Sequence, residues 1–197
     1  QRVGKNIAAI AGKPYYDWEF EVFVNSQANA FCLPGGKVGV TSSLFDFAAN
    51  DAELATVVGH EIGHAIARHG GERMTQSAVQ EIGAQAISYT TEEAMFVTAF
   101  GLLTNVGAIL PYSRAHEYEA DHIGLMLMAK AGYDPRASLS FWKKFGKDSS
   151  DSRLFEILST HPISKKRLEE MEKLQAKALE YYQKAPVKYG LGQKITP

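Results

Sequence analysis

The run His60-Glu61-x-x-His64 constrains this chain more than any other feature of its sequence. Residues four apart lie one turn apart on the same face of a helix, so the two imidazoles can reach one ion. Glu61 projects about 100° around the axis from His60, close enough to hold a water without binding the metal. Because neighbours such as Leu54 and Ile66 are apolar, the helix is half-buried and its imidazoles need partners. The run therefore predicts a helix that carries two ligands of a metal site.

A second stretch, from Tyr112 to Asp121, can supply the third ligand. A catalytic zinc ion usually keeps three protein ligands and one open position. Glu117 and Asp121 are four residues apart and share a helical face, so one can bind the metal while the other accepts a hydrogen bond from a ligating imidazole. Glu119 points the other way and is most simply a solvated acid. The spacing alone leaves open which of the two carboxylates is the ligand.

The composition is that of an ordinary globular domain. Of the 197 residues, 45% are hydrophobic and 22% are charged, and 21 basic residues nearly balance 22 acidic ones. No basic block or basic–aromatic stretch is present, so we expect no nucleic-acid partner. Cys32 is the only cysteine, which excludes an intrachain disulfide and a cysteine-based metal cage. The length suits one domain, placed at 1–197 with residues 185–197 as a loosely ordered tail.

The predicted elements begin with strands and continue with helices. A short helix ends near Gly12, the alternation over 18–24 predicts a half-buried strand, and 30–33 and 37–40 predict two strands joined by a tight turn. Helices are expected over 50–69, 72–88, 90–106 and 111–132, after Pro135 and after Pro162. This order predicts an α+β fold, mainly helical, in which a small antiparallel N-terminal sheet packs on a helical bundle.

Residues 94–110 form an uncharged run of 17 residues. That length is at the lower edge of a membrane span, and Asn105 interrupts the run. We therefore expect a core helix or a helix that touches a membrane surface.

The motif from His60 to His64, followed by Glu117 and Asp121, resembles peptidase family M48. This family contains HtpX-like quality-control proteases, CAAX prenyl endopeptidases and periplasmic outer-membrane-assembly proteases. Three more stretches agree with it: Asn29-Ala30-Phe31-x-Leu33-Pro34-Gly35-Gly36, Ser113-Arg114 and Thr160-His161-Pro162. The resemblance covers about residues 25–170 and implies a gluzincin metallopeptidase.

The resemblance also assigns the ligands. It implies one zinc ion (Zn²⁺) per chain, bound by His60, His64 and Glu117. Glu119 is not a ligand in this assignment. Asp121 is expected to accept a hydrogen bond from His60, which would fix the tautomer of that ring and raise its basicity toward zinc.

Two further side chains are candidates, each with an open alternative. His161 stands before Pro162 at a predicted helix start, where it either acts in the active site, on metal or oxyanion, or caps the helix. Arg114 lies one turn before Glu117 and either orients that carboxylate, or binds the substrate backbone, or faces solvent. Three other histidines are interpreted as ordinary surface or core residues: His69, His116 and His122.

The strand that contains Asn29, Ala30 and Phe31 is the candidate substrate-binding element. An edge strand can pair with an extended peptide without demanding a particular sequence. The alternative is a purely structural hairpin.

We therefore expect a zinc-dependent endopeptidase that hydrolyses peptide bonds, in protein quality control. Zinc lowers the pKa of a bound water to about 7 and polarises the scissile carbonyl. Glu61 takes the water proton and passes it to the leaving amine, and His161 stabilises the tetrahedral oxyanion.

Two other functions remain open at this point. One is a binding or chaperone-like module that keeps the metal without cleaving, against which the intact Glu61 argues. The other is metal-dependent hydrolysis of a non-peptide substrate. The expected partner is an extended or unfolded polypeptide, with possible membrane association. The expected location is the bacterial periplasm or a membrane surface to which a soluble catalytic domain is attached.

Overall fold

The computed structural model describes residues 1–72 and 113–195. The first part contains α1 (Arg2–Ile10), β1 (Glu19–Phe23), β2 (Ala30–Leu33), β3 (Lys37–Thr41), the 3-10 helix η1 (Ser42–Asp46) and α2 (Asp51–Ile66). The second contains α5 (Arg114–Lys130), α6 (Arg136–Lys147), the 3-10 helix η2 (Ser152–Leu154), α7 (Phe155–Thr160) and α8 (Lys165–Lys184). Apart from residue 72, the helices predicted over 72–88 and 90–106 lie outside the described residues, as does the uncharged run 94–110.

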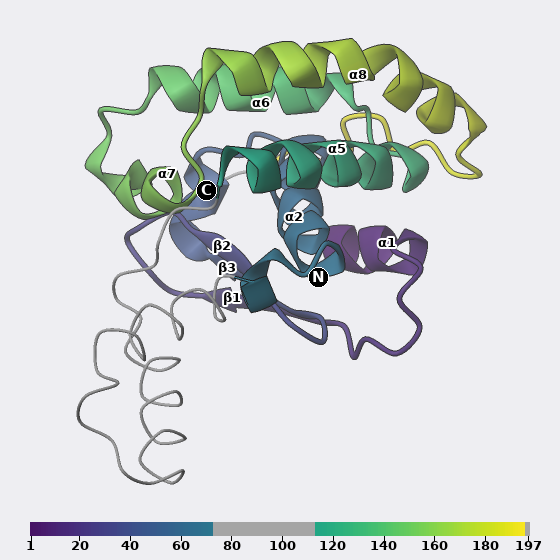
Figure 1. Ribbon diagram of the computed structural model, residues 1–197, viewed down its shortest axis with the longest axis horizontal. Coiled ribbons are helices and arrows are strands. Elements are labelled where there is room, and N and C mark those ends of the chain that lie inside the picture. The colour runs from purple at the N-terminus through teal and green to yellow at the C-terminus, as the bar shows by residue number, and fades with distance from the viewer. Residues whose placement is uncertain (73–112, 196–197) are drawn as a thin grey trace, which may run out of the picture.

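The elements stack in layers (Figure 1). The sheet packs against α2, α5 crosses α2, and α8 covers α5 with α6 beside it. Helix α1 lies against α2 next to the sheet. The predicted α+β class, mainly helical with a small N-terminal sheet, is therefore confirmed. Within the described ranges, no helix combines the length and the apolar character needed to cross a membrane.

The sheet is mixed rather than wholly antiparallel, which corrects one detail of the prediction. Strands β2 and β3 form the expected antiparallel hairpin, with Leu33 paired to Lys37. Strand β1 pairs with β3 in parallel, with Glu19 opposite Lys37. The cause is the strand order β1-β3-β2. Because β3 lies between two strands that run in opposite directions, it must be parallel to one of them.

Helices α2 and α5 cross with their backbones in close contact. Gly59 and Gly63 of α2 face Gly124 and Ala120 of α5. A Cβ on Gly124 would lie 2.7 Å from the carbonyl carbon of Gly59, and a Cβ on Gly63 would lie 2.8 Å from the carbonyl oxygen of Ala120. These distances leave no room for a larger side chain. The small residues therefore bring the polar faces of the two helices within reach of each other.

Helix α2 begins as predicted and ends earlier. The Asn50 side chain accepts a hydrogen bond from the Glu53 backbone N–H at 3.0 Å, which is the capping interaction expected from the spacing. The helix was expected to continue to His69, but it ends at Ile66. Arg68 has a φ of 63°, so the chain turns sharply before His69.

The segment after α8, predicted as a tail, forms backbone hydrogen bonds with the start of α2. The backbone N–H groups of Asp51 and Ala52 donate to the carbonyls of Gln193 (3.0 Å) and Leu191 (3.1 Å). Asp51 also accepts a hydrogen bond from the Gln193 backbone N–H at 2.7 Å. The segment thus satisfies N–H groups in the first turn of α2 that have no partner inside the helix.

Candidate metal centre

Four buried side chains bring one potential ligand atom each within 4.8 Å of one another: His60, His64, Glu117 and His161. None is more than 3% exposed. The two histidines of the motif come from α2, Glu117 from the first turn of α5, and His161 from the residue that ends α7. The structure thus brings the three predicted ligands together and adds His161 as a fourth donor.

The donor atoms face one another at short range. His60 Nε2 lies 3.0 Å from His64 Nε2. The carboxylate of Glu117 approaches both rings, with Oε1 at 3.2 Å from His64 Nε2 and Oε2 at 3.5 Å from His60 Nε2. Two imidazole nitrogens and a carboxylate therefore converge on one small volume.

Asp121 lies behind His60, away from this volume. Its Oδ1 is 2.9 Å from His60 Nδ1. An ionised carboxylate only accepts hydrogen bonds, so His60 Nδ1–H donates and the Nε2 of the neutral ring holds an electron pair. This donor set fits Zn²⁺, which takes imidazole nitrogens and carboxylate oxygens in tetrahedral sites. The structure thus places Asp121 beside His60, the partner that the family resemblance implies.

The electrostatics favour a positive charge inside the cluster. Burial opposes a charge on His60, but the carboxylates of Glu117 and Asp121 outweigh it and raise the pKa of His60 to about 10. Burial, helped by the neighbouring His60 and His161, lowers the pKa of His64 to about 2 in spite of Glu117. Burial also opposes the charge on Glu117, yet its contacts with His60 and His161 lower the pKa of this carboxyl group. Two carboxylates buried this closely need positive charge beside them, which a proton on His60, a metal ion and the guanidinium of Arg167 can each supply.

Arg167 on α8 supports both carboxylates, and the sequence did not single it out. It is 4% exposed, and its Nη1 pairs with Glu117 Oε2 at 2.5 Å. Its Nε and Nη2 each donate to one Asp121 oxygen at 2.8 Å. Arg167 lies four residues before the buried Met171 and therefore on the apolar face of α8. A charged residue on that face is the signal in the sequence that could have identified it.

Arg114 is not the arginine that pairs with Glu117. It is the first residue of α5 and is exposed, as in the outward-facing alternative. The arginine that contacts Glu117 comes from α8 instead.

Glu61 and His161 lie side by side at the cluster. Glu61 is 2% exposed, and its Oε1 is 3.4 Å from His161 Nε2. The other ring nitrogen, Nδ1, is 3.0 Å from Glu117 Oε1 and 3.2 Å from His60 Nε2. His161 closes α7 rather than opening a helix, because α8 starts at Lys165 with Ser164 as its cap. This corrects the predicted helix-start position.

The candidate substrate strand, β2, is an edge of the three-stranded sheet and packs against α2. Asn29, just before the strand, donates from Nδ2 to Glu156 Oε2 at 3.1 Å, which anchors the strand to α7. Ala30 is buried, whereas Phe31 is 37% exposed on the outer side of the sheet. The edge position is the one that pairing with an extended peptide requires.

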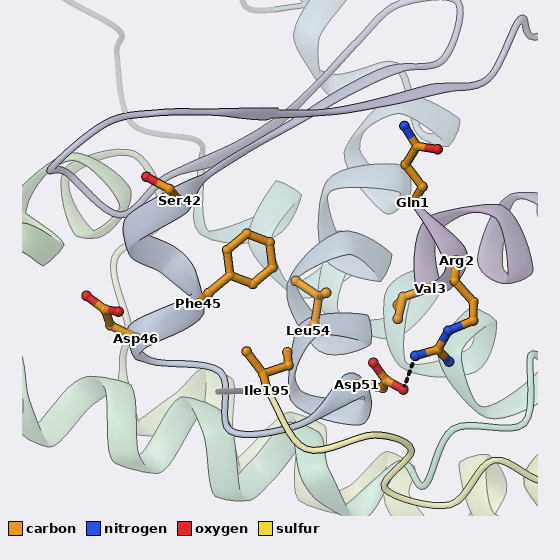
Figure 2. Close-up of a pocket in the computed structure, with 9 residues that line it drawn as sticks. All are labelled: Gln1, Arg2, Val3, Ser42, Phe45, Asp46, Asp51, Leu54 and Ile195. Atoms are coloured by element: carbon orange, nitrogen blue, oxygen red, sulfur yellow. Dashed lines mark hydrogen bonds and ion pairs between the residues drawn. The ribbon is translucent and has the colours of Figure 1, made fainter. Parts of the chain in front are cut away.

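A separate hollow of about 420 Å³ lies away from the metal cluster (Figure 2). It is lined by residues of α1, η1 and the first turn of α2, including Arg2, Phe45 and Asp51. Arg2 and Asp51, two of its lining residues, form an ion pair of 2.7 Å. Because Asp51 is nine positions before His60, about 14 Å along the helix axis, this hollow is not part of the cluster.

A helix with two histidines one turn apart, a glutamate beside the first and a carboxylate from a second helix is the layout of a zincin-type metallopeptidase centre. The chain belongs to Peptidase family M48, whose family model matches residues 1–175. The resemblance predicted from the motifs is thus confirmed.

Three relatives illustrate what the chain is similar to. It is 45% identical to mitochondrial metalloendopeptidase OMA1 of Arabidopsis thaliana over 76% of this chain and 30% of that protein. It is 37% identical to mitochondrial metalloendopeptidase OMA1 of Schizosaccharomyces pombe over 87% of this chain and 50% of that protein. It is 31% identical to beta-barrel assembly-enhancing protease of Yersinia pestis over 84% of this chain and 36% of that protein. The chain therefore spans between 30% and 50% of the length of these relatives.

Proposed function

We propose that this chain is the catalytic domain of a zinc-dependent endopeptidase, with residues 1–197 forming one domain. The observation that carries the proposal is the convergence of His60 Nε2, His64 Nε2 and Glu117 next to the buried Glu61, in a member of Peptidase family M48. The names of the relatives, which are metalloendopeptidases and a protease, support the same activity.

The three predicted ligands, His60, His64 and Glu117, would hold one zinc ion per chain. Bound zinc supplies Lewis-acid chemistry, lowering the pKa of a water to about 7 and polarising a carbonyl. Asp121 holds the proton of His60 at Nδ1 and so keeps Nε2 available as a ligand. Arg167 pairs with Oε2 of Glu117, while Oε1 lies nearer to the rings, at 3.2 Å from His64 Nε2.

Glu61 is assigned as the general base. It lies beside the ligands without being one of the converging donors, so it can take a proton from the attacking water and pass it to the leaving amine. His161 Nε2 lies near Glu61 and is assigned as the hydrogen-bond donor for the oxyanion.

The substrate is assigned as an extended or unfolded polypeptide that pairs with β2 near Asn29, Ala30 and Phe31. This mode needs backbone groups rather than a set sequence and suits protein quality control. The relatives are named from mitochondria and from bacteria, and the proposal places the domain at a membrane in one of those settings, the bacterial periplasm among them.

The substitution Glu61→Gln tests the proposal. It removes the base and keeps every ligand, so zinc content and fold should be unchanged while cleavage of an unfolded protein falls by about 10²–10⁴-fold. Glu172→Gln, on the exposed side of α8, is the matched control and should cleave like the wild type. A metal chelator should abolish cleavage by the wild type. Substantial proteolysis by the Glu61 variant would assign the base elsewhere, and a wild type that binds peptide without cleaving it would favour a binding module.

A further inference from the structure

His69 lies directly behind the second histidine of the motif. It is 2% exposed, and its Nδ1 is 2.9 Å from His64 Nδ1. The turn at Arg68, with its φ of 63°, makes this contact possible. A straight continuation of α2 would have carried residue 69 a further turn along the axis and away from residue 64. The two rings are nearly perpendicular, at 72°, with their centroids 5.0 Å apart.

The other nitrogen of His69 reaches a carboxylate. His69 Nε2 is 3.2 Å from Glu119 Oε2 on α5, and the Glu119 side chain is 60% exposed. A second ring, His116, stacks on His69 at 4.2 Å and 19° and lies 2.9 Å from Glu72 Oε2. The His69 ring is therefore held at its outer nitrogen and across its face.

The direction of these hydrogen bonds follows from the chemistry of their ends. The carboxylate of Glu119 only accepts, so His69 Nε2 carries the proton. In the neutral ring, His69 Nδ1 then holds an electron pair, and the partner that can donate to it is His64 Nδ1–H. This places the proton of His64 on Nδ1 and the electron pair on Nε2, which faces Glu117.

We infer that His69, anchored by Glu119, is a positioning residue that fixes the ring and tautomer of His64 as a metal ligand. The inference deepens the proposed function and rests on it. Each imidazole of the motif then has its own outer acceptor: Asp121 for His60 and His69 for His64. Since the outer partner of a ligating histidine orients the ring and sets its basicity, His69 contributes to metal affinity without touching the metal.

Zinc affinity is the first readout, measured by competition with a chromogenic chelator. His69→Phe keeps the ring and removes the acceptor, so zinc should bind about 10–100-fold more weakly. His69→Asn places an amide oxygen near the former Nδ1 and should restore most of the affinity. The control is His122→Phe, at an exposed position of α5, which should bind zinc like the wild type. A purely structural role for His69 would give equal losses in the Phe and Asn variants.

The second readout is the tautomer of His64, measured on the zinc-loaded wild type by long-range ¹H–¹⁵N NMR of the histidine rings. We expect the proton of His64 on Nδ1 and that of His69 on Nε2, with the His64 proton protected from solvent exchange and losing that protection in His69→Phe. A His64 proton on Nε2, or unchanged zinc affinity in His69→Phe, would overturn the inference while leaving the proposed function intact. A wild type that binds no zinc would overturn the proposed function as well.

Discussion

The substitution Gly124→Ala tests whether the contact between α2 and α5 builds the metal centre. The new Cβ would lie 2.7 Å from the Gly59 carbonyl carbon and from the His60 backbone nitrogen, whereas ordinary contacts begin at 3.4 Å. Both obstacles are backbone atoms, so they cannot rotate away, and the helices must separate by about 0.7 Å. If the full separation of about 0.7 Å is added to the 2.9 Å distance between His60 Nδ1 and Asp121 Oδ1, that distance becomes about 3.6 Å, which is too long for a hydrogen bond.

The matched control is Gly146→Ala, inside α6. There the new Cβ would lie 3.5 Å from Ile163 Cγ2, an ordinary contact. Both variants replace a helical glycine by alanine, so the loss of stability that only Gly124→Ala shows reports the overpacking at Gly124. We expect Gly124→Ala to be less stable than Gly146→Ala by about 1–3 kcal/mol.

The assay measures the free energy of unfolding in urea and the zinc affinity of both variants. Gly124→Ala should also bind zinc about 10–100-fold more weakly, because its ligands lose their outer support. Equal stability and equal zinc affinity in the two variants would refute the claim that the close crossing positions the ligands.

Three further predictions follow from the same structure. Asp121→Asn should weaken zinc binding by about 10–100-fold, with activity partly restored by added zinc; unchanged affinity would reduce Asp121 to a structural ion-pair partner. Arg167→Met leaves two buried carboxylates without their guanidinium, so the free energy of unfolding should fall by about 3–5 kcal/mol, whereas Lys165→Met, at a 92% exposed side chain, should change it little. Ending the chain after Ala185 removes two backbone hydrogen bonds at the start of α2, about 1 kcal/mol each, together with those to Ala49, Gly132 and Asp134, and should lower Tm by at least about 4–8 °C; an unchanged Tm would show that the segment does not stabilise the fold.

The part of the site that the sequence could predict is the part set by helix geometry. The four-residue spacings of His60 with His64 and of Glu117 with Asp121 each fix a shared face. The two faces meet, with Glu117 in the cluster and Asp121 behind His60. What joins the two pairs is the crossing of two helices. The small residues that permit it are also four apart, Gly59 with Gly63 and Ala120 with Gly124, so each pair shares a helical face, but the spacing does not tell which helix that face meets. The family resemblance, rather than the spacing, selected Glu117 as the ligand.

The missed residues depend on local or long-range geometry that periodicity does not encode. His69 was interpreted as an ordinary histidine because it lies off the face of a helix extended to residue 69. The helix in fact ends at Ile66, and the left-handed turn at Arg68 is followed by the contact of His69 with His64, 2.9 Å between their Nδ1 atoms. Arg167 comes from a helix far along the chain, and only its pairing with buried carboxylates reveals its role. The parallel pairing of β1 was missed because alternation predicts a strand but not its direction.

The contact between Gly59 and Gly124 also limits how the ligands can be exchanged. The backbones of α2 and α5 are in contact and cannot approach further. The distance from each backbone to the centre of the cluster is therefore fixed, and each ligand side chain has to span it. An aspartate in place of Glu117 would withdraw the carboxylate by about one C–C bond, roughly 1.5 Å. Helices already in contact cannot move closer to make up this distance. In this fold the length of a ligand side chain therefore matters for metal binding as much as its chemistry.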